Sequence, residues 1–205
     1  MSDVIIRAAR ASDTDFCIPL VDAASGGVWT QVWRELAVDE SMQQCAARYL
    51  NDEQMPVCIP KAVIAASDQT RLGVMFAHDS DLTVPSDRMR QHYSAVSEDL
   101  AQALRPYAAL VVPNSYFIAE LGCAPESRGQ GVGTMLIHHA HVTARTRGLT
   151  STSLRVFSAN EGAIRLYQRC GFEVVDSRPV VAHPAIRFTG EVLLMRRPVD
   201  PGGGV

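Results

Sequence analysis

A strand followed by a glycine-rich turn is the feature that most constrains how this chain can fold. The run SYFIAELGCA predicts a strand, and the stretch ESRGQGVGTML after it carries Gly129, Gly131 and Gly133 at alternate positions ahead of apolar residues. Glycines at this spacing let the backbone turn sharply and open a helix at about Val132. The first N–H groups of a helix have no partner within it, so such a turn can hold a phosphate group. The strand TSLRVFS follows, which predicts two parallel strands joined by a right-handed crossover.

The rest of the chain alternates strand-like and helix-like patterns. Their order predicts an α/β fold with a mixed sheet. We expect one domain over residues 1–198, with a helical insert at 79–115 between strands, and a disordered tail at 199–205. The other expected elements are a strand at 4–9, helices within 15–24, 28–36 and 39–52, two antiparallel strands within 61–80, a helix at 160–172 capped by Asn160 and ended at Gly171, and last strands at 173–180 and 190–197.

Length and charge narrow the class of protein. At 205 residues the chain suits one domain with a sizeable core. Its formal net charge of −3 gives no electrostatic footprint for nucleic acid or for an anionic membrane surface. We see no signal peptide in MSDVIIRAARASD and no apolar run near the ~18 residues of a membrane span. Five cysteines at wide, irregular spacing indicate buried thiols in a reducing, cytoplasmic compartment.

Three interpretations of the glycine turn compete. A Walker loop needs a lysine before Ser or Thr, but Gly133 precedes Thr134 directly and Lys61 is the only lysine. A dinucleotide site needs G-x-G-x-x-G and an acid about 20 residues on, whereas no acid lies between Glu126 and Glu161. A pyrophosphate at the helix start fits the spacing, and a tight turn without ligand stays open. We expect an anion-friendly patch from the arginines of this segment, which are Arg128, Arg145, Arg147 and Arg155.

Two linked motifs in this region resemble those of the GNAT superfamily, the acetyl-CoA-dependent N-acetyltransferases. The first is R/Q-x-x-G-x-G/A after a strand, and the second is N-x-x-A-x-x-x-Y-x-x-x-G-F. The close resemblance covers about a third of the chain. It implies a mixed, mostly antiparallel sheet of about six or seven strands with helices on both faces. The matching positions are Arg128, Gly131 and Gly133, then Asn160, Ala163, Tyr167, Gly171 and Phe172.

The resemblance also implies where acetyl-CoA binds. Backbone amides of the turn hold the pyrophosphate in this family, with Arg128 alongside. The pantetheine arm pairs with the preceding strand and bonds to Asn160, which can equally be a plain helix cap. An acyl-cysteine on Cys123 is disfavoured because most members transfer the acetyl group directly. The implied cofactor-binding residues are Leu121, Gly122, Cys123, Arg128, Gly129, Gln130, Gly131, Val132, Gly133, Thr134, Asn160 and Ala163.

The resemblance gives Tyr167 the role of general acid for the departing thiolate. Its alternative is a core aromatic, because it lies on an apolar helical stripe. Glu120 is the candidate base for the amine, with a water chain as the alternative. Strand alternation places Glu120 on the face of Ile118 and Gly122, opposite Leu121 and Cys123. The family's sheets commonly splay at a bulge here, which would make this alternation unreliable. A backbone N–H near Cys123 is the candidate donor to the oxyanion.

Other chemically active residues are given weaker roles. His138, His139 and His141 invite a metal site, but no carboxylate accompanies them, and we expect a solvated or phosphate-facing surface and no metal. Trp29 and Trp33 are one helical turn apart, and we expect core packing rather than a wall of the acceptor pocket. His183 lies between the last strands, within possible reach of the acceptor site.

The sequence therefore predicts an N-acetyltransferase that moves acetyl from acetyl-CoA to a primary amine by direct attack. The acceptor is a small molecule or a protein, and specificity is expected from residues 21–55 and 79–115. We expect no nucleic-acid or membrane partner and allow for a homodimer. The alternative function is a catalytically silent module that senses acyl-CoA.

Overall fold

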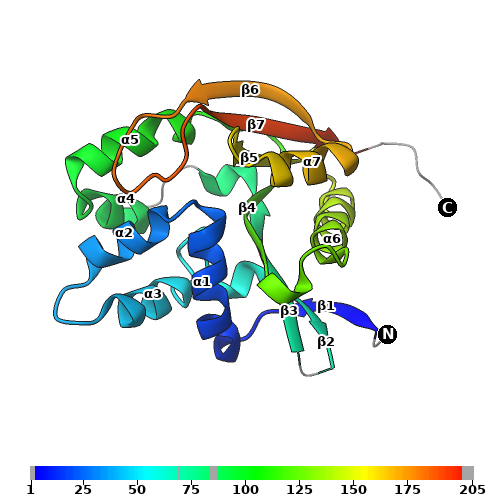
Figure 1. Cartoon of the computed structure of the whole chain (residues 1–205), viewed down its shortest axis with the longest axis horizontal. Helices are drawn as coiled ribbons and strands as arrows, with labels where there is room; N and C mark the ends of the chain where they lie inside the picture. Colours follow the sequence, from blue (N-terminus) through cyan, green and yellow to red (C-terminus); the bar gives the residue numbers. More distant parts are fainter. Residues whose placement is uncertain (1–2, 69, 84–86, 200–205) are drawn as a thin grey trace.

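A twisted mixed sheet organises the protein in a computed structural model that describes residues 3–68, 70–83 and 87–199 (Figure 1). The strand order is β1-β2-β3-β4-β5-β7-β6, and every neighbouring pair is antiparallel except β4 and β5. The mixed, mostly antiparallel sheet is therefore confirmed. The strands are β1 (Val4–Ala8), β2 (Ala62–Ser67), β3 (Thr70–Asp79), β4 (Ser115–Cys123), β5 (Ser151–Phe157), β6 (Glu173–Pro179) and β7 (Glu191–Pro198).

Helices cover both faces of this sheet, also as expected. The helical insert between β3 and β4 consists of α4 and α5. The predicted tail falls outside the described residues from 200 on, and Val199 donates its backbone N–H to the carbonyl of Thr150. The helices are α1 (Thr14–Ala24), α2 (Val28–Leu36), α3 (Met42–Leu50), α4 (Asp87–Ser94), α5 (Glu98–Ala108), α6 (Val132–Thr146) and α7 (Glu161–Arg169), with short 3-10 turns η1 (Ala11–Asp13), η2 (Ile59–Lys61), η3 (Ser80–Thr83) and η4 (Pro125–Ser127).

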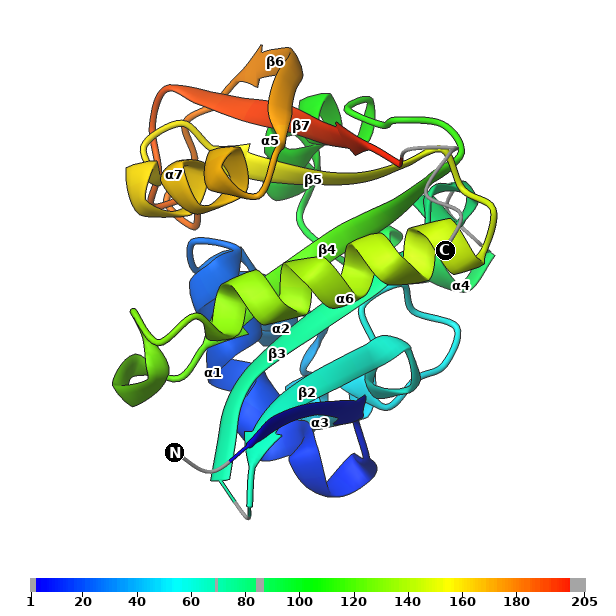
Figure 2. The same ribbon diagram turned by 90° about the vertical axis from the view of Figure 1, so that its right-hand side faces the viewer.

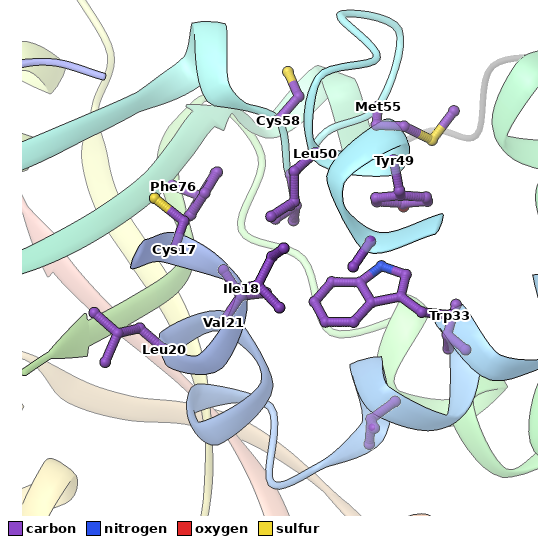
Figure 3. Close-up of a cluster of buried hydrophobic side chains, with 14 of the residues drawn as sticks. Cys17, Ile18, Leu20, Val21, Trp33, Tyr49, Leu50, Met55, Cys58 and Phe76 are labelled. Carbon is purple, nitrogen blue, oxygen red and sulfur yellow. The ribbon is translucent and has the colours of Figure 1, made fainter. Parts of the chain in front are cut away.

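The alternation of side chains along the strands creates two separate hydrophobic cores. Phe76 of β3 points into one core, while its neighbours Met75 and Ala77 point into the other. The first core joins the sheet to α1, α2, α3 and α5, and Figure 3 shows Ile18, Trp33 and Leu50 among its side chains. The second core joins the opposite face of the sheet to α6 and α7.

The two central strands separate halfway along their length. The parallel pairing of β4 and β5 runs only from Ser115 with Ser151 to Ile118 with Leu154. Beyond that point β4 continues beside β3 to Cys123, and β5 continues beside β7 to Phe157. Figure 2 shows the two strands diverging toward α7 and the beginning of α6. The sheet therefore has an opening between its two central strands, called the split below.

Candidate active site

The turn that leads into α6 lies at the open end of the split. Gly131 precedes the helix in a left-handed conformation (φ 84°), and no side chain caps the helix. The first helical backbone bond is donated by Met135 to the carbonyl of Gly131, so the preceding N–H groups have no acceptor within the helix. Free N–H groups and the positive end of a helix dipole attract negative charge, so this helix start is suited to an anion.

The three glycines of the turn serve different purposes. Gly129 and Gly131 have positive φ, and a Cβ on either would meet nothing within 4 Å. Gly133 is closely packed, because a Cβ there would lie 3.0 Å from the side chain of Leu166 of α7. Gln130 donates its side-chain N–H to the carbonyl of Glu126 at 2.6 Å and so closes the turn on itself. An open backbone surface of this kind has room for a ligand above the first turn of α6.

The expected patch of four arginines does not form. Arg147 pairs with Asp79 at 2.8 Å and stacks on Tyr116, beyond the C-terminal end of α6. Arg155 lies over the ring of Phe117 and donates to the carbonyl of Tyr107. The acid-free sequence segment passes through a helix and a strand, so its arginines are distributed around the fold. Of the four, Arg128 is the one next to the turn, where its side chain is exposed.

A bulge in β4 controls where Glu120 points. Phe76 of β3 pairs with Glu120 and the next residue of β3 pairs with Ile118, so Ala119 is an extra residue. Ile118 stays on the α6 side, while Glu120 faces α2 and accepts a 2.7 Å bond from the indole N–H of Trp29. The predicted shared face with Ile118 is therefore wrong, and Glu120 lies with Gly122, which packs against α1.

The surroundings of Glu120 raise the pKa of its carboxyl group. Burial raises its pKa to about 8, opposed by the bond from Trp29 and by the charge of Arg155. The carboxylate of Asp22 adds to the increase. A carboxylate with this pKa is a suitable acceptor for the proton of an amine near neutral pH.

Tyr167 lies on the other face of the sheet from Glu120. It belongs to the core of α6 and α7, is 8% exposed and packs against Phe172 at 6.0 Å. Burial raises the pKa of its phenol well above the usual value, and the charges of Glu120, Cys123 and Cys170 raise it further. The phenol is therefore protonated at neutral pH and within electrostatic range of Glu120.

The remaining implied cofactor residues lie around the turn and α7. Asn160 caps α7, since its side-chain oxygen accepts from the N–H of Ala163 at 3.2 Å. Leu121 and Cys123 face α6, where the sulfur of Cys123 would lie 3.8 Å from a Cβ on Gly133. Burial raises the pKa of the Cys123 thiol, which makes it a poor nucleophile.

The histidines that the sequence singled out have different surroundings. His183 is bound to Asp99 of α5 at 3.3 Å and accepts from the N–H of Ala185. His141 contacts Thr152 at 3.2 Å and His138 is exposed. Among the described residues no group of three or more His, Cys, Asp or Glu side chains is arranged to hold a metal. None of the described helices has the length and hydropathy to cross a membrane.

Sequence reasoning missed the part played by Trp29. Trp33 is fully buried, as expected for core, but Trp29 is only partly buried and bonds to Glu120. The helical pairing of the two tryptophans was visible in the sequence. The partner of Trp29 lies 91 residues away, and no local signal connects them.

A family model matches the central part of the chain. Residues 86–172 match the model described as "Acetyltransferase (GNAT) family", a stretch that includes Glu120, the turn and Tyr167.

Curated relatives match parts of the chain. An uncharacterised N-acetyltransferase of Methanocaldococcus jannaschii is 45% identical over 56 residues, 27% of this chain and 25% of the relative. N-alpha-acetyltransferase 40 of Saccharomyces cerevisiae is 33% identical over 96 residues, 42% and 33% of the two chains. Streptothricin acetyltransferase of Streptomyces lavendulae is 42% identical over 55 residues, which are 27% of this chain and 29% of the relative. The matches thus span between a quarter and a third of the relatives' length.

Solved structures share the whole fold. A crystal structure of an acetyltransferase superposes with a TM-score of 0.67 at 17% identity, covering 96% of this chain and all of the other. A proposed acetyltransferase of Salmonella typhimurium, solved with its cofactor acetyl-CoA, gives 0.58 at 18% identity, covering 100% and 98%. At these identities the likeness concerns the fold alone, which this chain shares with the two solved acetyltransferases. The resemblance seen in the sequence is confirmed.

Proposed function

We propose that this chain, with its GNAT fold and motifs, transfers the acetyl group of acetyl-CoA to a primary amine by direct attack in a ternary complex. Residues 1–198 would act as one domain in this reaction. The observation that carries the proposal is the split between β4 and β5. An uncapped helix start lies at its open end, the Glu120 carboxyl group lies on one face of the sheet, and the Tyr167 phenol lies on the other.

The residues around the split fit acetyl-CoA. The unpaired N–H groups of Val132 to Thr134 would hold the pyrophosphate, and positive φ at Gly129 and Gly131 leaves their outer face free. The backbone of Leu121 to Cys123, unpaired on its β5 side, would accept an extended arm as an added strand. Acetyl-CoA would supply the thioester carbonyl that the amine attacks. Arg128 and Asn160 would lie along its length.

Two side chains would handle the protons. Glu120 would accept the proton that the attacking amine loses, and its raised pKa of about 8 suits that exchange. Tyr167 would donate a proton to the departing thiolate, since its raised pKa keeps the hydroxyl protonated. Because they approach from opposite faces, the amine would enter beside α1 and α2 and the donor beside α6 and α7. A water chain from the split to solvent is the alternative to Glu120.

The acceptor remains a primary amine of a small molecule or of a protein. The names of the relatives point both ways, to N-alpha-acetylation in yeast and to streptothricin in Streptomyces. The five cysteines are free thiols, which fits the cytoplasm as the place of the reaction.

The test is thiol release from acetyl-CoA across a panel of polyamines, aminoglycosides, lysine peptides and peptides with free α-amines. We expect turnover with one class of amine. A silent acyl-CoA sensor would instead show thermal stabilisation by CoA and no turnover with any amine. Absence of both would overturn the proposal.

A further inference from the structure

The first turn of α2 places the side chain of Trp29 against the carboxyl group of Glu120. Gly26 and Gly27, with φ of 71° and 95°, reverse the chain between α1 and α2. A Cβ on Gly26 would lie 2.6 Å from the ring of Phe188, so only glycine fits this approach. Asp22 and Ser25 then accept the backbone N–H groups of Thr30 and Trp29 and fix the start of the helix. The position of Trp29 beside β4 is therefore determined by local structure.

Aromatic packing fixes the orientation of this indole. Trp29 stacks on Trp33 with ring centres 5.7 Å apart and packs against Tyr49 at 5.1 Å. Its N–H donates to one oxygen of Glu120 at 2.7 Å. An indole nitrogen only donates, so this contact orders the carboxylate and favours its charged form. Among the described residues it is the only hydrogen bond to the carboxyl group, and the second oxygen is left for a substrate proton.

We propose that Trp29 is a positioning residue for catalysis: its indole N–H orients the Glu120 carboxylate so that the second oxygen receives the proton of the acceptor amine. This inference rests on the proposed function. In the step, the amine nitrogen bonds to the acetyl carbon, the carbon–sulfur bond breaks, and the proton leaves nitrogen for Glu120. Glu120 later returns the proton to solvent.

Other charged groups act on Glu120 from each neighbouring element. Arg155 of β5 favours the charged form and Asp22 of α1 opposes it. The charge of Glu120 in turn raises the pKa of the Tyr167 phenol on α7, which favours the neutral phenol. The described residues show no hydrogen bond from any of these three groups to Glu120, whereas Trp29 donates one. Removing the Trp29 indole should therefore change the titration of Glu120 most directly.

The chain supplies a matched control, because it has two tryptophans. Trp33 lies one turn further along α2, is fully buried, and its indole N–H meets no hydrogen-bond partner in the described structure. Trp29→Phe and Trp33→Phe therefore remove the same group from neighbouring positions in one aromatic stack. Only the first removes the bond to Glu120.

The first experiment needs no turnover. In the Trp33→Phe protein, which keeps a single tryptophan, the indole N–H signal of Trp29 is followed by NMR against pH. We expect a sigmoidal change with its midpoint at the Glu120 titration, and a flat line after adding Glu120→Gln. A signal that is flat in both proteins, or that titrates identically in both, would refute the pairing.

The second experiment is a pH profile of kcat with an amine that gives turnover in the thiol-release panel. Trp29→Phe should raise the apparent pKa of the rising limb by about one unit and lower kcat at pH 7 about tenfold, with the KM for acetyl-CoA unchanged. Trp33→Phe should leave the apparent pKa of the rising limb unchanged. In a protein that already carries Glu120→Gln, adding Trp29→Phe should not lower kcat further. An unshifted limb, or an additive loss, would overturn the role of Trp29. Failure of every amine would contradict the proposed function while the NMR result still decides the pairing.

Discussion

Burial of Glu120 in the folded protein disfavours the charged form of its carboxyl group. Its pKa of about 8 means that burial penalises the charge more than Trp29 and Arg155 compensate for it. Residues with strongly shifted pKa values, placed at an opening in a fold, are frequent at active sites. The same burial that destabilises the charged carboxylate gives it a proton affinity close to that of its proposed substrate.

Replacing Glu120 should therefore stabilise the free protein in a pH-dependent way. The folded pKa is above the unfolded value, so the folded state retains a proton that the unfolded state has lost between about pH 4.5 and 8. Stability then falls as pH rises through this window. Glu120→Gln keeps an oxygen for Trp29 and has no charge, so its Tm should exceed that of the wild type by about 2–5 °C at pH 8 and by little at pH 5. Thermal melts at both pH values measure this difference, and an equal difference at the two pH values would contradict the buried charge.

Tyr167→Phe tests the phenol. Loss of a general acid lowers kcat by about a hundredfold or more, while CoA affinity measured by calorimetry should not change. Tyr116→Phe is the control, because it removes a buried hydroxyl from the same core without touching the split. Equal kcat in the Tyr167 and Tyr116 variants would remove Tyr167 from the acid role.

At the scale of the elements, two short irregularities shape the site. The extra residue Ala119 rotates Glu120 to the α2 face, and the glycine turn exposes the first N–H groups of α6. Neither changes the order of strands and helices. Both decide which chemical groups face the split.

Gly131→Ala should weaken donor binding. Its added methyl group would enter the open space above the α6 N-terminus, and the KM for acetyl-CoA should rise about tenfold. Gly148→Ala is the matched control, since Gly148 also has positive φ (72°) with nothing near its Cβ, but lies at the other end of α6. Both variants should lose similar stability from backbone strain, about 1 kcal/mol. An equal rise in KM for both would argue against the turn as the donor site.

At the scale of the whole molecule, the sheet consists of two parts joined at a short seam. Strands β1 to β4 and strands β5 to β7 are connected in the sheet by four parallel residue pairs. A ligand in the split would bridge the two parts where they diverge. Such a ligand should slow the hydrogen exchange of amides mainly in the central strands and at α6.

Hydrogen exchange with and without CoA checks this arrangement. At a CoA concentration about 100 times Kd, amides of residues 119–134 should exchange up to about a hundredfold more slowly. Residues 4–8 and 62–67, at the far edge of the sheet, should show little change. Protection spread evenly over the chain, or absent from 119–134, would place the ligand elsewhere.

Local patterns in the sequence determined the elements and their order. Strand alternation, helical periodicity and glycine stops predicted all seven strands and the helices of both faces, because each signal lies within a few neighbouring residues. The glycine turn followed for the same reason. The motif positions around it predicted the family fold, while the roles of the individual residues stay proposals.

Only the tertiary structure decided which side chains meet. The pair of Trp29 and Glu120 spans 91 residues, and the direction of Glu120 depends on one bulge whose register is set by pairing with β3. The arginines predicted to form one patch lie apart, because Arg147 follows the end of α6 and Arg155 belongs to β5. Contacts between distant segments depend on how the sheet and helices pack together, and no short stretch of sequence contains that information.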